Sequence, residues 1–240
     1  DAIARFKFIC DDLGLDLIEI GSSLSVAASV GKMEMGSPDS VLTLLAEIEE
    51  GSEFGHVLAD GVVSTANFLG VKRIPAIKGQ AIPGHDPRTV KGIGVTYVTS
   101  PMGADHTAGF TYKKSLQNVG QADNSLKAQV SAAVNDTLGY CMNAVPGTGE
   151  LNKFFADLIR ARFGTQLTSD DIVELGKQTL KEELKFNQEA EFGKKAIDIP
   201  EFVRKEEVPP SNQIFDVSNN ELTTIWNKLD IYKETHKIWE

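Results

Sequence analysis

The chain is 240 residues long and has a mass of 26.1 kDa, which is enough for one large domain or two smaller ones. Hydrophobic residues make up 41% of it and charged residues 24%, a composition that excludes a wholly disordered chain. The net charge of −10 excludes a general electrostatic attraction to nucleic acids or anionic membranes.

Two further features of the sequence narrow the class of protein. No apolar run approaches the roughly 18 residues that a membrane-spanning helix needs, and no basic-then-apolar leader opens the chain. The two cysteines, Cys10 and Cys141, are too few for a scaffold built on several disulfides. We therefore expect a soluble, cytoplasmic protein with neither a nucleic-acid nor a membrane partner.

The N-terminal residues predict an amphipathic helix. Apolar side chains fall at helical intervals from Ile3 to Leu13, and Gly14 is placed to end the helix as a C-cap. Because the chain starts inside this helix and has no initiator Met, we expect it to be the downstream part of a longer protein.

Residues 17–70 also carry helical patterns. Small and apolar residues predict a helix over 17–30 that packs closely against its neighbours. Ser37 is an N-cap for a helix that ends near Gly51, and a further helix is predicted over 54–69.

The character of the chain changes over residues 74–106, which hold four of the nine prolines and five of the 21 glycines. Residues 74–83 predict an extended segment with turns, because proline is excluded from helix interiors. Long segments of this composition inside a folded domain are typically functional or disordered, and the interleaved hydrophobic residues favour an ordered, functional segment.

Within this segment the sequence predicts one short helix. Asp86 followed by Pro87 is typical of a helix start, and the helix is expected to run to Val98. Gly92 and Gly94 weaken it, and their lack of a side chain would let another backbone or a ligand approach closely.

Beyond residue 109 the chain is predicted to be helical again, with no alternation of strands and helices. The fold class is therefore mainly α and multihelical. The predicted elements are helices over 125–138, 149–163 and 168–191, an irregular stretch over 197–217, and one or two terminal helices from residue 219 with Trp226 and Trp239 as anchors.

Two short segments share the pattern Asp-x-Leu-Gly-apolar-Asp/Cys. One spans residues 11–16 and the other residues 136–141, and each lies where a predicted helix gives way to a glycine turn. Such a turn exposes backbone groups beside a carboxylate, which together can bind the edge of a flat heterocycle. The alternative is ordinary turn chemistry, since Asp and Gly are common at helix ends.

Two of the four histidines, His85 and His106, fall in the segment rich in Gly and Pro, next to Asp86 and Asp105. An imidazole in a loop cleft can act as a general acid, a general base or a hydrogen-bond donor. The alternative is a hydrogen bond that only stabilises the loop. Cys10 lies on the apolar face of the first helix and is expected to belong to the core.

Taken in order, these motifs resemble the tungsten-containing aldehyde:ferredoxin oxidoreductases. The resemblance rests on three strings and appears collinear through Leu184-Lys185-Phe186-Asn187 to the C-terminus, so that it covers essentially the whole chain. The strings are residues 10–16, residues 78–106 with their His-Asp-Pro-Arg and Met-Gly-Ala-Asp-His runs, and residues 136–141.

The resemblance implies a three-domain enzyme at least about twice as long as this chain, in which a β-rich N-terminal domain forms a base under the cofactor. The present chain would be the two helical domains that close over it. It implies helical domain 2 over residues 1–110, including an active-site loop over 74–106, and helical domain 3 over residues 111–240.

The resemblance further implies a tungsten atom held by the dithiolenes of two pterins, with each pterin gripped by one of the two turns. Asp11, Leu15 and Asp16 would hold one pterin; Asp136, Tyr140 and Cys141 would hold the other. Cys141 would also be the fourth thiolate of a cubane 4Fe-4S cluster, whose other three cysteines are expected upstream. Tyr140 stands where the family usually has Leu.

His106 matches the family's active-site histidine, and the resemblance implies that it hydrogen-bonds the developing oxyanion or moves protons. His85 would be an aldehyde-orienting donor, at a position where the family commonly has Tyr. The implied partners are an aldehyde, ferredoxin, the missing N-terminal domain and a second copy in a homo-oligomer.

The function predicted is oxidation of aldehydes to carboxylic acids at the tungstopterin centre, with electrons passed through the cluster to ferredoxin. One alternative is a relative of the same fold that uses molybdenum or another substrate. The other is a helical interaction module without redox chemistry. The chain alone, lacking three cluster thiolates and one domain, is expected to bind no cofactor.

Overall fold

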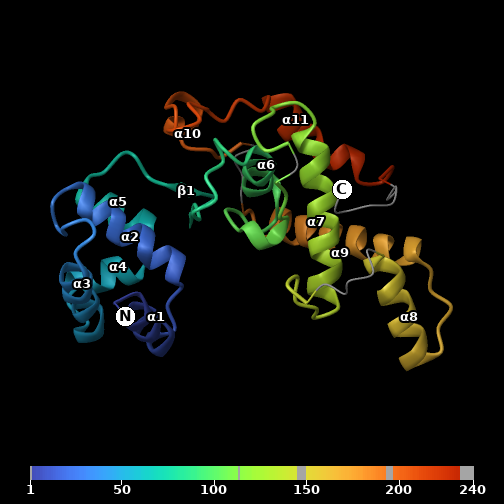
Figure 1. Cartoon of the computed structure of the whole chain (residues 1–240), viewed down its shortest axis with the longest axis horizontal. Coiled ribbons are helices and arrows are strands. Elements are labelled where there is room, and N and C mark those ends of the chain that lie inside the picture. The colour runs from blue at the N-terminus through green and yellow to red at the C-terminus, as the bar shows by residue number, and fades with distance from the viewer. Residues whose placement is uncertain (1, 113, 145–149, 193–196, 233–240) are drawn as a thin grey trace.

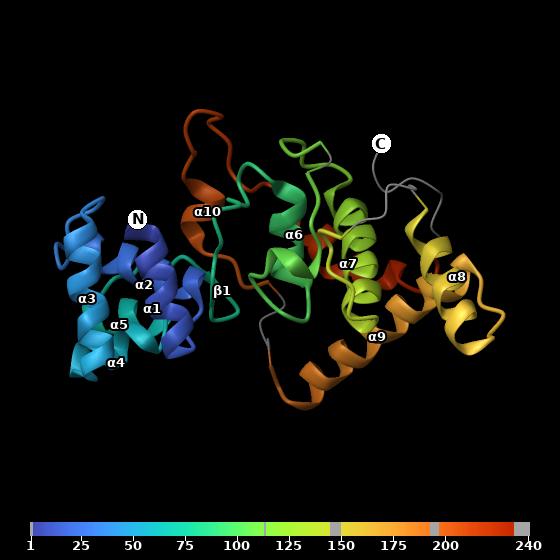
Figure 2. The same cartoon turned by 60° about the horizontal axis from the view of Figure 1, so that its bottom comes forward.

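The computed structural model describes residues 2–112, 114–144, 150–192 and 197–232. These residues form eleven α-helices, two short 3₁₀ helices and one two-stranded hairpin, so the prediction of a mainly α, multihelical fold is confirmed. The helices form two groups, with the hairpin between them (Figures 1 and 2). None of the described helices is both long enough and apolar enough to cross a membrane.

The first group holds the five N-terminal helices, drawn in blue in Figure 1. Their apolar faces enclose a core around Leu45 and Leu58, and Cys10 is fully buried in it, as predicted. Each helix that the sequence predicted before residue 50 is present. The bounds are α1 Ala2–Leu13, α2 Leu17–Ser29, α3 Pro38–Glu50, α4 Glu53–Ala59 and α5 Val62–Leu69.

A carboxylate from α2 marks the break between α4 and α5, where the sequence predicted one continuous helix over 54–69. Gly61 between them has a φ of 97° and supplies no side-chain cap. Glu19 accepts a hydrogen bond from the N–H of Val62 at 2.7 Å and so caps α5 instead. A β-carbon at residue 61 would lie 2.6 Å from Glu19 Oε1. The prediction of a single helix was wrong because it overlooked this distant partner.

The hairpin confirms the extended segment predicted over 74–83. Strands β1 (Ala76–Ile77) and β2 (Gln80–Ala81) pair antiparallel, and the turn residues Lys78 and Gly79 have φ values of 53° and 83°. Positive φ at both positions is typical of a tight hairpin turn. The carboxylate of Glu19 accepts the N–H of Ala81 at 2.8 Å, so it joins β2 to α2 as well as to α5.

Helix α6 (Lys91–Thr99) is buried on every side, at the centre of the second group. It starts later than predicted, since residues 86–90 form a turn in which Asp86 accepts the N–H of Arg88. Other parts of the chain approach its glycines closely. A β-carbon on Gly94 would lie 2.6 Å from the Phe215 ring and 2.7 Å from Pro87.

The long helix α7 and the C-terminal segments pack against α6, while α9 packs on α7 and α8 packs on α9 (Figures 1 and 2). Thr168 and Asp171 form a capping box at the start of α9, the helix predicted over 168–191. The bounds are η1 His106–Ala108, α7 Gln121–Thr137, α8 Leu151–Phe163, α9 Ser169–Glu189, α10 Glu201–Lys205, α11 Asn219–Thr224 and η2 Ile225–Lys228.

The core of the second group joins α6 to segments from the end of the chain. Tyr97, Phe215 and Ile225 are fully buried in it, and Trp226 packs against it. Trp239, the other predicted anchor, lies outside the described residues. The core includes residues on both sides of residue 110, and the division into domains there stays a prediction.

Replacing Glu19 by Gln turns one accepting oxygen into a donor, so the N–H of Val62 or Ala81 loses its partner. We expect the free energy of unfolding, measured in urea, to fall by about 1–3 kcal/mol. Glu49→Gln on the exposed surface of α3 removes the same charge and is expected to change it by less than about 0.5 kcal/mol. Equal effects of the two variants would contradict the bridging role of Glu19.

Gly94→Ala is expected to destabilise the fold by about 1–3 kcal/mol, because the added methyl group overlaps the Phe215 ring. Gly21→Ala in α2 is the matched control. Its β-carbon meets nothing within 4 Å, so it should be neutral or stabilising by up to about 1 kcal/mol. Urea unfolding of both variants tests this, and a stable Gly94→Ala protein would show that α6 is not tightly packed.

Candidate active site

The two Asp-x-Leu-Gly turns have the same backbone geometry. In the first, Gly14 has a φ of 69° and the N–H of Leu15 bonds to the carbonyl of Cys10 at 2.8 Å. In the second, Gly139 has a φ of 64° and the N–H of Tyr140 bonds to the carbonyl of Asn135, also at 2.8 Å. Each is a Schellman motif that closes a helix, α1 and α7 respectively. The sequence repeat is therefore a structural repeat.

At the first turn both predicted carboxylates are exposed. Asp11 forms an ion pair with Lys7, one helical turn before it. Asp16 is the N-cap of α2, where its Oδ1 accepts the N–H of Glu19 at 2.7 Å. The side chain of Leu15 packs against the core of the first group. Asp16 thus has a structural task that sequence reasoning did not assign to it, and this task uses one of its two oxygens.

At the second turn the predicted residues face different surroundings. Cys141 is exposed, and the structure records it as a free thiol. Tyr140 stacks edge-on against Phe155 with ring centroids 5.1 Å apart, and its hydroxyl donates to the carbonyl of Ala144. Burial raises the pKa of Asp136 above its usual range, and the negative charge of Asp105 raises it further. Helix α7, which ends at this turn, contacts η1, which begins at His106.

The two turns lie in different groups of helices. The end of α1 belongs to the blue group in Figure 1, and the end of α7 belongs to the group around α6. Among the described residues no hydrogen bond or ion pair joins residues 11–16 to residues 136–141. A shared ligand surface between them stays a prediction.

The structure brings His85 and His106 together. Their ring centroids lie 5.0 Å apart, and Phe110 packs against both at 5.2 and 5.9 Å. Tyr112 completes this aromatic cluster, with its hydroxyl 3.0 Å from Nδ1 of His85. Burial lowers the pKa of His85, and the neighbouring His106 lowers it further, so a neutral imidazole is favoured.

His106 holds a buried polar atom that the described protein does not satisfy. Its Nδ1 is inaccessible to solvent and has no hydrogen-bond partner among the residues that the structure describes. A buried polar atom without a partner costs about 1–3 kcal/mol, so functional sites are where such atoms are expected. Asn135 Oδ1, one residue before Asp136, is in the same condition.

The 3₁₀ helix η1 that begins at His106 is held from both sides. Asp105 accepts the N–H of Thr107 at 2.7 Å and caps it. The hydroxyl of Thr96 in α6 donates to the carbonyl of Gly109 at 2.9 Å and lies 2.7 Å from the Ser125 hydroxyl of α7. The aspartate beside His106 therefore shapes the loop and does not pair with the imidazole.

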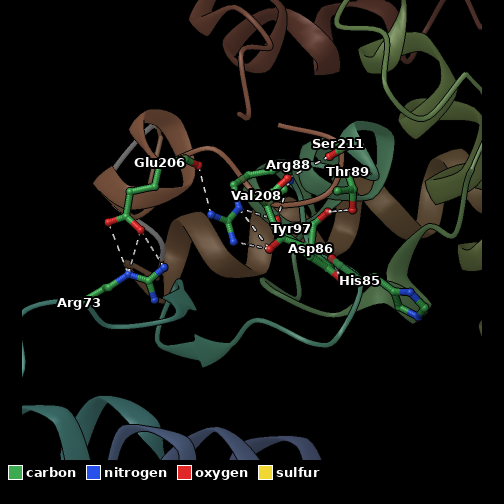
Figure 3. A network of polar contacts seen from close by, with 9 residues as sticks. All are labelled: Arg73, His85, Asp86, Arg88, Thr89, Tyr97, Glu206, Val208 and Ser211. Carbon is green, nitrogen blue, oxygen red and sulfur yellow. Dashed lines mark hydrogen bonds and ion pairs between the residues drawn. The ribbon is translucent and has the colours of Figure 1, made fainter. Parts of the chain in front are cut away.

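A network of charged groups holds the backbone of the His85 loop, and Figure 3 shows it from close by. Asp86 binds the guanidinium of buried Arg88, with contacts of 2.6 and 2.9 Å. Arg88 also donates to the carbonyl of Glu206, whose carboxylate pairs with Arg73 at 2.9 Å. The ring of His85 points away from this network. The backbone carbonyl of His85 accepts a hydrogen bond from the Tyr97 hydroxyl at 3.2 Å.

Helix α9, which packs against α7, carries a further carboxylate with a shifted pKa. Burial raises the pKa of Glu183, and the charge of Asp136 raises it further. No group of three or more His, Cys, Asp or Glu residues in the described chain is arranged to hold a metal ion. A cleft of about 540 Å³ is lined by Met102, Glu183 and Phe186 among others.

Sequence reasoning missed Phe110 and Tyr112. Both follow the predicted loop over 74–106, and both contact His85 through their rings. The signal was present as two aromatic residues directly after Gly109, a position where a chain leaving a loop often carries its anchors. That both rings contact His85 depends on the path of η1, which the sequence does not reveal.

Comparison with known families gives this helical fold its class. The family model described as "Aldehyde ferredoxin oxidoreductase, domains 2 & 3" matches residues 1–228. The chain therefore belongs to the aldehyde ferredoxin oxidoreductase family, and the resemblance predicted from its motifs is confirmed.

Two relatives carry the description "tungsten-containing aldehyde ferredoxin oxidoreductase". The protein from Pyrococcus furiosus is 25% identical over 267 residues, which cover 99% of this chain and 44% of that protein. The protein from Pyrococcus horikoshii is 25% identical over 219 residues, which cover 79% of this chain and 35% of that protein. The chain spans less than half the length of the relatives it matches.

The Asp86–Arg88 pair makes a pH-dependent contribution to stability. Burial of Asp86 opposes its ionisation, but hydrogen bonds and charge from Arg88 outweigh burial and lower its pKa below 3.8. The pair therefore stabilises the fold above about pH 4, and this contribution is lost as the pH falls through the lowered pKa.

We expect Asp86→Asn to lower the free energy of unfolding by about 1–2 kcal/mol at neutral pH, a value reduced for the partial exposure of Asp86. The gap from wild type should narrow on acidification below about pH 4, as measured by urea unfolding. Asp157→Asn removes exposed ion pairs and should cost less than about 0.5 kcal/mol. A gap that stays constant with pH would contradict the assignment.

Proposed function

We propose that this chain is the C-terminal portion of an enzyme that oxidises aldehydes to carboxylic acids. In the reaction an aldehyde and water yield a carboxylic acid, two protons and two electrons. When bound, a tungstopterin centre would supply the acceptor for both electrons, and a 4Fe-4S cluster would pass them on to ferredoxin. The observation that carries the proposal is the pair of Asp-x-Leu-Gly turns, which have the same hydrogen bonds at the ends of α1 and α7.

The donor set at the two turns fits a pair of flat heterocycles rich in N–H groups. Asp11, Asp16 and Asp136 offer exposed carboxylate oxygens that accept hydrogen bonds. At Asp16 the Oδ2 atom stays available while Oδ1 caps α2. A donor placed against Asp136 would offset the burial that raises the pKa of this carboxyl.

The remaining residues assigned to the cofactors are Leu15, Tyr140 and Cys141. Leu15 and Tyr140 follow the glycines of the two turns and would place their backbone groups against the pterins. Cys141 is an exposed free thiol, the condition that a cluster ligand requires before the cluster is inserted. The other thiolates would come from the part of the enzyme upstream of this chain.

His106 is proposed to exchange a proton with the reacting oxygen, and His85 to donate a hydrogen bond to the substrate. The rings of the two histidines are 5.0 Å apart, close enough for one small carbonyl compound to contact both. The buried Nδ1 of His106, which has no partner in the described protein, supports a role that is completed only when the site is loaded.

In the full-length protein, purified without oxygen, His106→Ala is expected to lower the turnover of aldehydes by about 10²–10⁴-fold, because a positioned acid or base is lost. The tungsten and iron contents should stay at the wild-type level. His56→Ala, an exposed histidine on α4, is the matched control and should keep its turnover.

Two results would contradict this proposal. If wild-type full-length protein binds neither tungsten nor molybdenum, the chain belongs to the interaction module considered as an alternative. If His106→Ala retains turnover or loses the metal, the role of His106 is wrong. Molybdenum in place of tungsten would leave the roles of the residues intact and correct the metal.

A further inference from the structure

The contact between Tyr112 and His85 joins two residues that are 27 positions apart and lie in different loops. The phenol oxygen is 3.0 Å from Nδ1 of the imidazole, and the two rings meet nearly edge-on, with centroids 5.9 Å apart. Phe110 supports Tyr112 from the side at 4.7 Å. Tyr112 is 50% exposed, so the hydrogen bond lies at the surface, where packed rings flank it, and it involves a defined nitrogen of His85.

The chemistry of the two groups decides which one donates. A phenol O–H is a stronger acid than the N–H of a neutral imidazole, and an imidazole nitrogen is a much stronger base than a phenol oxygen. Burial and the neighbouring His106 both favour the neutral form of His85 by lowering its pKa. In that form Nδ1 accepts the phenol proton in a hydrogen bond, and the ring's own proton stays on Nε2.

We propose that Tyr112 is a positioning residue: its hydroxyl donates to Nδ1 of His85 and fixes the tautomer that presents an N–H at Nε2. His85 is then a hydrogen-bond donor for an acceptor oxygen, such as the carbonyl oxygen of an aldehyde. This last step rests on the proposed function, whereas the tautomer does not.

The surroundings of His85 agree with this assignment. Within the described part of the chain, the side chain of His85 makes its polar contact through Nδ1, and Nε2 has no partner there. The main chain is fixed independently, since Tyr97 binds the carbonyl of His85 and Arg88 binds the adjacent Asp86. The orientation of the ring therefore depends on Tyr112 and on the packing of Phe110 and His106.

The tautomer is read directly by nitrogen NMR of the ¹⁵N-labelled chain. Two-bond proton–nitrogen spectra separate a protonated imidazole nitrogen from an unprotonated one, and His85→Gln identifies the signals among only four histidines. At neutral pH we expect His85 to show an unprotonated Nδ1 and a protonated Nε2. A protonated Nδ1 overturns the proposal, and this result needs no variant at Tyr112.

The second measurement uses Tyr112→Phe, which removes the hydroxyl and keeps the ring. We expect the ¹⁵N signal of Nδ1 to move and the pKa of His85 to rise, because a hydrogen bond to the neutral form is lost. Tyr97→Phe is the matched control: it removes a hydroxyl bound to the backbone of the same residue and should leave both nitrogen signals in place. Near-UV circular dichroism checks that each variant is folded.

The outcomes separate this inference from the proposed function. If Tyr112→Phe leaves the nitrogen signals and the pKa of His85 unchanged, Tyr112 does not position His85. If the tautomer is as expected but the full-length protein oxidises no aldehyde, the hydrogen bond stands and the proposed function fails. If the full-length enzyme is active, Tyr112→Phe should raise KM for the aldehyde by more than it lowers kcat, since its effect is on orientation.

Discussion

The carboxylate of Glu19 is the contact on which the path of the first hundred residues depends. One of its oxygens accepts the N–H of Val62 at the start of α5, and the other accepts the N–H of Ala81 in strand β2. Helices α2 and α5 and strand β2 therefore meet at one charged group. Hydrogen bonds from two backbone N–H groups to a charged carboxylate are stronger than the same bonds to neutral acceptors. The hairpin that Glu19 holds leads directly into the loop that carries His85. A residue of α2 therefore helps to position a histidine of the candidate site.

The second group is organised around helix α6, whose residues are all buried. Helix α6 is buried all round, and its one charged side chain, Lys91, pairs with Asp216 at 2.6 Å near the end of the chain. The Gly94 backbone lies against Phe215 on the same segment. The loops that carry His85 and His106 precede and follow α6, so the packing of this helix helps to place both loops.

Local signals predicted the helices because their causes are local. The serine at residue 37, the capping box at Thr168 and the glycines of the two Schellman turns each act within a few residues. The break at Gly61 and the late start of α6 escaped prediction because a distant carboxylate causes the first, and the second follows from Asp86 binding Arg88 within a turn. For the candidate site, the roles assigned from the motifs stay predictions, and the meeting of His85 with Tyr112 required the fold.

The electrostatic potential at the two Schellman turns depends on which helix ends meet there. The first turn joins the carboxyl end of α1 to the amino end of α2, which Asp16 caps. The second is the carboxyl end of α7, where the aligned peptide dipoles concentrate partial negative charge beside the exposed Asp136. Phosphate groups are favoured at the opposite end of a helix, so they are repelled here. A ligand of the second turn would therefore present hydrogen-bond donors to it and keep anionic groups away from it.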